Sequence, residues 1–122
     1  MNMDDVERRL TAYFAEAAGT EIDRDIFRGI LPEDKCDAVG VFINSDDTGN
    51  TPSMQKYSAQ ILGRYLNRND AMNTATLYCK LLPYYGADMV ILRAGSAMTY
   101  RSRWDSRNAW GISINLQLTV RQ

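Results

Sequence analysis

The sequence contains no histidine, and its two cysteines, Cys36 and Cys79, do not form a C-x-x-C motif. Histidine is the commonest general base in enzymes and the commonest neutral metal ligand. Its absence excludes catalytic triads and zinc sites that depend on imidazole. We expect both cysteines to be small structural residues, while a disulfide between them stays open because sequence does not show whether they meet.

Long apolar runs are also missing. The longest, residues 89–92 and the alanine-rich stretch 15–18, are far too short to span a bilayer. The N-terminus, MNMDDVERRL, is acidic and polar, whereas a signal peptide needs a basic start and an apolar stretch. We therefore expect a protein that is made and kept in the cytoplasm and has no membrane partner.

Motifs that bind phosphate or hard cations are absent as well. Neither G-x-x-x-x-G-K-[ST] nor G-x-G-x-x-G occurs. Asp46 and Asp47 lack the ligand spacing of a calcium loop, so a solvated turn is favoured. Glu21, Asp23 and Asp25 would lie on one side of an extended chain, where a charged solvent-facing edge is favoured over a cation site. The sequence predicts no catalytic residue, no metal and no cofactor, and favours a protein that is not an enzyme.

The composition is that of one globular domain over residues 1–122, since 45% of the residues are hydrophobic and 24% are charged. The formal net charge of −1 conceals an uneven distribution. Residues 1–50 carry 12 acidic and 5 basic side chains, whereas residues 51–122 carry 3 acidic and 9 basic ones. Two oppositely charged halves matter more for association than the total does.

Apolar periodicity predicts two helices. Residues 3–18 place apolar side chains at spacings of three and four, with Asn2 as the N-cap and Gly19 as a left-handed stop. A second, alanine-rich helix follows a cap at Asn69 or Asp70.

Alternation of apolar and polar residues predicts the strands. In residues 110–120 every even position is apolar and every odd one is small or polar, which is typical of an antiparallel strand with one face on a core. Further strands are expected at 38–44, 57–66 and 89–93, an extended arm or short edge strand within 21–31, and a connection over 94–108. We expect an α+β domain with a mostly antiparallel sheet of about four to five strands and two helices packed on one face.

Residues 93–107 combine arginines with aromatic residues. The candidates are Arg93, Tyr100, Arg101, Arg103, Trp104 and Arg107. Arginine and aromatic side chains are enriched at the centres of protein interfaces, and they also bind single-stranded nucleic acid. A sequence pI of about 5.3 argues against a dedicated nucleic-acid binder. We favour a protein interface over a solvated loop, and both over nucleic acid.

The order of these segments resembles that of the small phage minor capsid or tail terminator proteins over nearly the whole chain. The pieces that carry the resemblance are LPED before AVGVFINSDD, YSAQILGRYLNRND before AMNTATLYCKLL, and SRWDSRNAW before GISINLQLTV. The most telling is the centre, where a strand that ends in Arg64 is followed within six residues by an Asp or Asn cap and an alanine-rich helix.

This resemblance implies a non-enzymatic structural protein of a bacteriophage or prophage virion, assembled in the cytoplasm of the host bacterium. Tail terminators form a ring, typically a hexamer, that caps the tail tube and joins it to the head. The implied partners are further copies of the chain, the tail tube protein, a head completion or connector protein, and DNA in the lumen. Head-to-tail contacts in a ring need two complementary patches, which the two charged halves would supply if they lie on opposite flanks.

Other functions stay open at this point. One is another small head-tail connector or tail component, which would share the same segment pattern. Another is a small binding module that uses residues 93–107 for nucleic acid. An enzyme subunit is the least favoured, because the sequence has neither histidine nor a catalytic motif.

Overall fold

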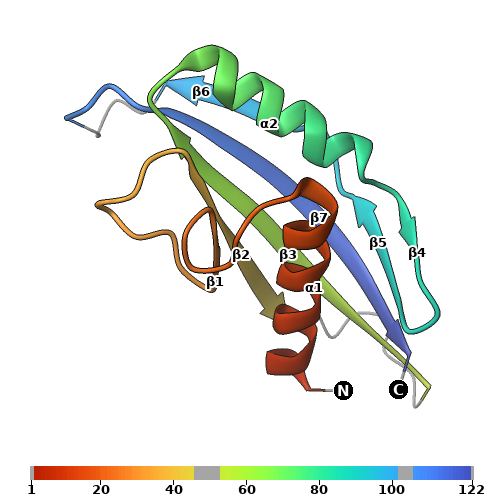
Figure 1. Ribbon diagram of the computed structural model, residues 1–122. Coiled ribbons are helices and arrows are strands. Elements are labelled where there is room, and N and C mark those ends of the chain that lie inside the picture. The colour runs from red at the N-terminus through yellow and green to blue at the C-terminus, as the bar shows by residue number, and fades with distance from the viewer. Residues whose placement is uncertain (1, 46–52, 102–105, 122) are drawn as a thin grey trace.

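The protein is described here by a computed structural model that covers residues 2–45, 53–101 and 106–121. In these ranges the chain forms two helices and seven strands. Their bounds are α1 Met3–Ala18, β1 Ile26–Arg28, β2 Ala38–Ser45, β3 Met54–Tyr65, α2 Arg68–Lys80, β4 Tyr84–Tyr85, β5 Met89–Arg93, β6 Met98–Arg101 and β7 Trp110–Arg121. Both helices lie on the same face of one sheet (Figure 1), so the predicted α+β class with two helices is confirmed.

The sheet has the strand order β1-β2-β3-β7-β5-β4, and β6 pairs with β7 beside this path. The long strand β7 therefore has β3 along one edge, and β6 and then β5 along the other. The sheet is mostly antiparallel, as expected, but the expected number of four to five strands is wrong. β1 runs parallel to β2, and β4 and β6 add two short strands, β6 lying inside the stretch expected to be a connection. Strands of two to four residues are too short to show an alternating pattern.

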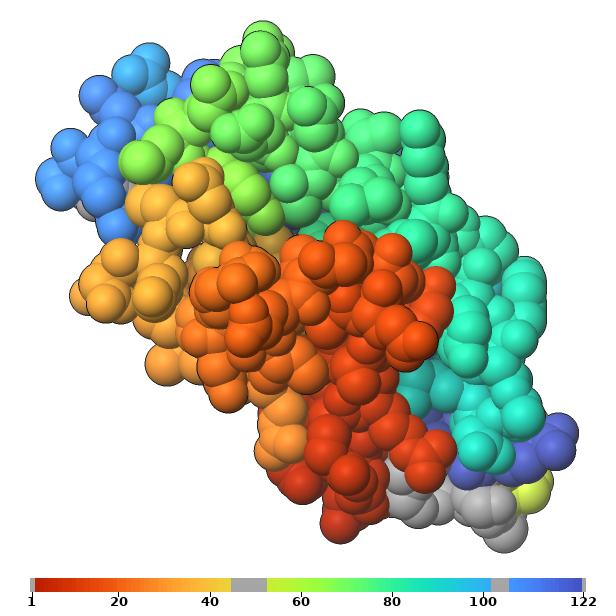
Figure 2. Space-filling view, in the orientation of Figure 1, coloured from red at the N-terminus to blue at the C-terminus, as the bar shows by residue number. Residues whose placement is uncertain are grey.

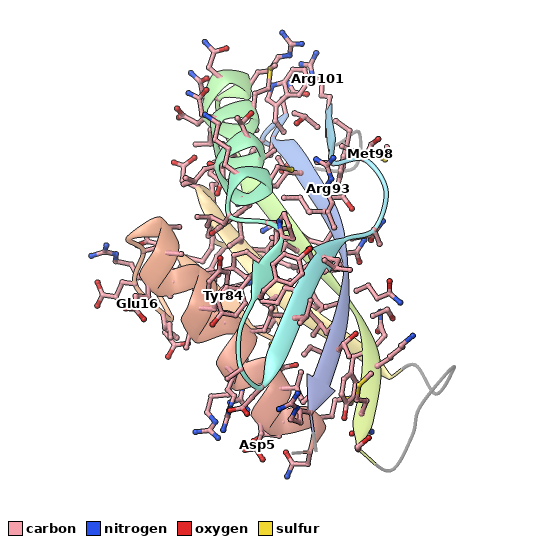
Figure 3. The ribbon with its side chains drawn as sticks, turned by 90° about the vertical axis from the view of Figure 1, so that its right-hand side faces the viewer. Asp5, Glu16, Tyr84, Arg93, Met98 and Arg101 are labelled. Carbon is pink, nitrogen blue, oxygen red and sulfur yellow. The ribbon has the colours of Figure 1, made fainter. Side chains whose placement is uncertain are left out.

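The core lies between the sheet and the two helices. The apolar positions of β7 face it, as predicted, and Ile112, Ile114, Leu116, Leu118 and Val120 are buried. Both helices cover these residues with a buried apolar stripe, and Phe14 of α1 meets Tyr78 of α2 edge to face at 5.3 Å between ring centroids. Neither of the two helices in the described ranges lies on the opposite face of the sheet (Figure 3), and the central strands expose polar side chains there.

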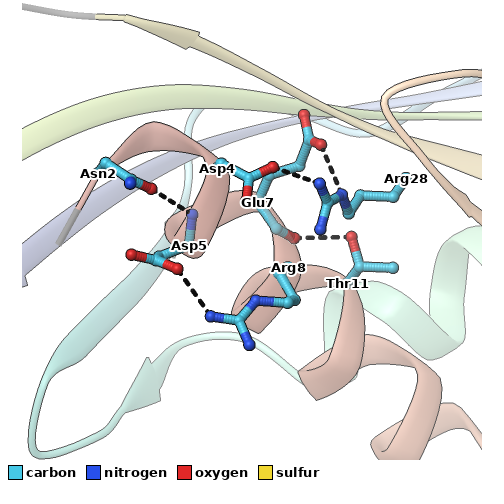
Figure 4. Close-up of polar contacts among 7 residues, drawn as sticks. All are labelled: Asn2, Asp4, Asp5, Glu7, Arg8, Thr11 and Arg28. Carbon is cyan, nitrogen blue, oxygen red and sulfur yellow. Dashed lines mark hydrogen bonds and ion pairs between the residues drawn. The ribbon is translucent and has the colours of Figure 1, made fainter.

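The ends of α1 agree with the prediction. The Asn2 side chain accepts a hydrogen bond from the Asp5 backbone N–H at 2.8 Å, and Gly19 ends the helix with φ 68°. On the side of α1 that faces β1, Arg28 forms ion pairs with Asp4 and Glu7 (Figure 4). These pairs join the first helix to the first strand.

The start of α2 differs from the prediction. The N-cap is Asn67, whose side chain accepts from the Asn69 backbone N–H at 2.7 Å, so Asn69 and Asp70 already belong to the first turn. The reason is that β3 ends at Tyr65, and Asn67 is still extended with φ −112° and ψ 129°. Asn67 therefore occupies the half-helical position that a capping side chain needs.

Residues 19–37 run along the β1 edge of the sheet. Glu21 to Asp25 form a turn, in which the Asp25 backbone N–H donates to the Glu21 carbonyl at 2.9 Å. The prediction that the three alternating acids share one side of an extended chain is therefore wrong. Residues 29–37 then return to the start of β2, which is what makes β1 and β2 parallel.

Cys36, in this returning segment, and Cys79, in α2, are free thiols and half-buried, so no disulfide joins them. Neither helix in the described ranges has the length and apolar character that crossing a membrane requires.

Candidate interface at the β5–β6 edge

A cleft of about 400 Å³ opens between α2 and the edge formed by β5 and β6. The chain leaves the sheet after Arg93 and re-enters it at Met98, so β5 and β6 follow each other along the same edge of β7. The lining side chains of α2 are Met72, Ala75, Thr76, Cys79 and Lys80, and those of the edge are Arg93, Ala97 and Thr99. A second hollow of about 390 Å³ adjoins it and shares Cys79 and Arg93.

Strand register decides which face each β6 side chain occupies. Arg101 stands opposite Trp110, an even position of β7, so it projects to the helix side. Tyr100 stands opposite Gly111 and projects to the open face of the sheet. Its ring covers Gly111 so closely that a Cβ there would lie 2.5 Å from a ring carbon. This contact explains why a glycine occupies that position.

The candidate residues from the sequence therefore separate into different places. Arg93 and Arg101 are exposed on the helix side of the edge (Figure 3), while the register with β7 places Tyr100 on the other face. Arg107 is exposed in the turn before β7. Arg103 and Trp104 lie outside the described residues. Base stacking beside phosphate contacts requires arginines and aromatic rings on one surface. Arg93 and Arg101 do not share a surface with Tyr100.

Three residues of the cleft were missed by sequence reasoning. Met72, Thr76 and Lys80 are spaced by four and follow one stripe along α2. That spacing is the signal by which the stripe is recognisable in the sequence. Lys80 and Arg93 form no ion pair with any residue in the described ranges, so the rim of the cleft carries positive charge.

The opposite edge of the sheet is acidic. Arg24 forms ion pairs with Glu21 at 2.7 Å and Asp25 at 2.9 Å, and its guanidinium holds the pKa of the Asp25 carboxyl below the usual range. Glu33 and Asp34 in the returning segment are exposed and have no ion-pair partner among the described side chains. Figure 2 shows this N-terminal part on one flank and the end of α2 with the β4–β5 hairpin on the other.

A polar pocket of about 320 Å³ lies between the end of α1, α2 and residues 20–37. Its walls include the hydroxyl-bearing residues Tyr65 and Tyr78 and the carboxylates of Asp25 and Asp37. Burial raises the pKa of both tyrosines, so their hydroxyls stay neutral and act as hydrogen-bond donors. The pocket therefore offers hydrogen-bond donors and acceptors.

Across residues 2–45, 53–101 and 106–121, no three His, Cys, Asp or Glu side chains gather in a way that would hold a metal ion. Asp46 and Asp47, for which the sequence favours a solvated turn, lie outside these ranges. No protein-family model matches the chain, and no curated protein matches it either.

Proposed function

We propose that the chain is a non-enzymatic virion assembly protein of a phage or prophage, which forms a ring that caps the tail tube and joins it to the head, as tail terminators do. The observation that carries the proposal is the difference between the two edges of the sheet. The β1 edge is acidic at Glu33 and Asp34, and the β5–β6 edge is basic at Lys80 and Arg93. A ring built from head-to-tail contacts needs two such unlike, complementary surfaces on each subunit.

The positions of the two edges support this reading. Ile26 of β1 and Thr99 of β6 end the same transverse row of the sheet, which runs through Val39, Gly63 and Ile112. A subunit therefore presents its β1 edge and its β6 edge in opposite directions. Repeating one contact between unlike edges produces a closed ring when the rotation per subunit divides a full turn, and a filament when it does not.

The partners beyond the ring are the tail tube protein and a head completion or connector protein, with DNA passing through the lumen. Surfaces outside the subunit contact are available for them. The sheet face without helices is one, where the Gln60 side chain donates to Ser113 Oγ at 3.1 Å within a polar ladder. The turn at Arg107 is another.

The proposal is tested by electron microscopy of the purified protein, alone at high concentration and mixed with tail tubes that lack a terminator. We expect rings of uniform diameter and a capped tube end. Ring formation should weaken as salt rises, because screening reduces attraction between exposed charges. A protein that forms no rings and binds no tube end would contradict the proposed function, and rings that are indifferent to salt would remove its electrostatic part.

A nucleic-acid-binding module is the second candidate, favoured by the exposed cations Lys80, Arg93 and Arg101 along one edge. Binding to single-stranded DNA at moderate salt separates it from the first proposal. A true binder shows a steep loss of affinity with salt, since each neutralised phosphate releases counterions. Another small head-tail connector would share the same geometry, and the position of the gene among the head and tail genes distinguishes that case.

A further inference from the structure

We infer that the cleft between α2 and the β5–β6 edge receives residues 29–37 of a second copy of this chain. The inference rests on the proposed function, because it names the contact between neighbouring subunits of the ring. We call residues 29–37 the acidic loop and the cleft lined by Lys80 and Arg93 the basic cleft.

The acidic loop is held in a defined shape. Arg64 Nη1 donates to the carbonyl oxygens of Pro32 at 2.7 Å and Lys35 at 2.9 Å. Gly40 lets the loop approach β2, because a Cβ there would lie 2.5 Å from the Ile30 carbonyl oxygen. A loop that is already ordered loses little conformational entropy when it docks.

What the acidic loop presents matches what the basic cleft offers. The loop exposes the carboxylates of Glu33 and Asp34 next to Lys35, and it also carries Ile30, which is 55% exposed. The cleft places Lys80 and Arg93 beside the methionine side chain of Met72, which is 42% exposed. An arginine fork binds a carboxylate with two parallel hydrogen bonds, and the two apolar side chains bury each other's surface.

A single chain does not bring these two surfaces together. The loop is held by Arg64 of β3 and packs on Gly40 of β2, whereas the cleft lies against α2 at the far edge of β7. The loop lies against β2 at the left of Figure 1, whereas Figure 3 looks onto the β5–β6 edge that carries Arg93. The occupant of the basic cleft is therefore a loop from a neighbouring copy.

The two surfaces also lie on different sides of the sheet. The loop crosses the open face at Gly40, while the cleft lies on the helix side, between α2 and Arg93. Docked neighbours therefore do not extend one flat sheet. This offset between neighbouring sheets also prevents the exposed edge of β6 from pairing with a strand of the next subunit. Continuous pairing of exposed strand edges leads to aggregation.

The test uses charge reversal in the full-length chain. A cleft variant carries Lys80→Glu with Arg93→Glu, a loop variant carries Glu33→Lys with Asp34→Lys, and a swapped variant carries all four. The matched controls are Glu16→Lys and Arg121→Glu, which reverse exposed charges elsewhere. Circular dichroism and thermal unfolding establish that each variant keeps the fold, and sedimentation equilibrium measures self-association.

We expect the cleft variant and the loop variant each to weaken self-association by about tenfold or more, because each places like charges against each other. An equimolar mixture of the two should restore association, since alternating subunits then pair an acidic loop with a basic cleft at one contact and a lysine loop with a glutamate cleft at the next. The swapped variant should associate by itself for the same reason. The controls should behave as the wild type.

Other outcomes separate the inference from the proposed function. Self-association that survives the cleft reversal overturns the inference and leaves the ring intact. Loss of tail-tube binding with unchanged self-association overturns it as well, because the cleft then serves another partner. If the wild-type chain stays monomeric at millimolar concentration, weak association is measured by NMR as the concentration is raised. Amide chemical shifts near Lys80 and Glu33 that do not change with concentration also overturn the inference. The proposed function fails separately, when neither rings nor tube binding occur.

Discussion

Arg64, in the central part of the sheet, donates from Nη1 to the carbonyl oxygen of Pro32 at 2.7 Å, although 32 positions separate them in sequence. The same nitrogen reaches the Lys35 carbonyl oxygen at 2.9 Å. The side chain of β3 thus determines the shape of the acidic loop at the edge of the sheet. Arg64 therefore acts on the proposed subunit contact as a positioning residue.

Replacing Arg64 with alanine should lower the free energy of unfolding by about 1–3 kcal/mol, because two backbone carbonyls lose a charged donor. The helices and sheet should persist, while amide exchange in residues 29–37 should become faster. Arg64→Lys is the matched control. Its free energy of unfolding should fall between those of the wild type and Arg64→Ala, since an ammonium keeps the charge but lacks the planar fork. Loop exchange that stays at the wild-type rate in Arg64→Ala would contradict the positioning role.

Gly40 and Gly111 provide a matched pair for close packing. An added Cβ lies 2.5 Å from the Ile30 backbone oxygen at Gly40, and 2.5 Å from the Tyr100 ring at Gly111. Gly40→Ala should destabilise the fold by about 1–3 kcal/mol, because the backbone must shift. Gly111→Ala should cost less, because Tyr100 is 41% exposed and its ring can turn away. Urea denaturation of both variants measures which one loses more stability. Equal losses would show that the backbone at Ile30 moves aside as easily as the Tyr100 ring.

Stability should decline at alkaline pH because of Tyr65 and Tyr78. Burial raises the pKa of both hydroxyls in the folded protein above the unfolded value of about 10. The unfolded chain therefore releases these protons first, so the stabilising contribution is complete below pH of about 10 and is lost as pH rises toward the folded pKa. Urea unfolding from neutral to alkaline pH measures this, and Tyr78→Phe should flatten the decline. An unchanged slope in Tyr78→Phe would assign the effect to other groups.

Arg28 should contribute more to stability than Arg8, although both form ion pairs with acids of α1. Arg28 contacts Asp4 and Glu7 from another element of the fold, whereas Arg8 pairs with Asp5 one turn away at 2.7 Å (Figure 4). We expect Arg28→Ala to lower the free energy of unfolding by up to about 1 kcal/mol and Arg8→Ala to have almost no effect. Raising the salt concentration should reduce the difference between the two variants, and a difference that survives high salt would point to packing instead.

Replacing Arg101, Arg103 and Arg107 together with alanine should leave the fold intact and impair docking to the tail tube or the head connector. Arg101 and Arg107 are exposed, so their removal leaves no cavity in the core. Circular dichroism checks the fold, and a head-tail joining assay checks the function. Normal joining by this triple variant would exclude residues 101–107 from the docking surface.

Much of the fold was predictable from patterns within single segments. The helix over residues 3–18 and its cap at Asn2 agree with the structure, as does the strand that alternates from Trp110 onward. These elements are long enough for the spacing of apolar residues to distinguish a helix from a strand. The edge strand β1 lies within the range 21–31 expected for it, whereas the short strands β4 and β6 were not predictable in the same way, because their stability comes from pairing with longer neighbours.

The sequence by itself determined the α+β class, the buried face of β7 and the uneven distribution of charge along the chain, because each depends only on neighbouring residues or on composition. Tertiary structure alone decided that Arg101 and Tyr100 lie on opposite faces of the sheet, that Lys80 lies beside Arg93, and that the acidic loop and the basic cleft lie at opposite edges. The physical reason is that face and edge follow from strand register and strand order. Both depend on pairing between segments far apart in the chain, which no local pattern encodes.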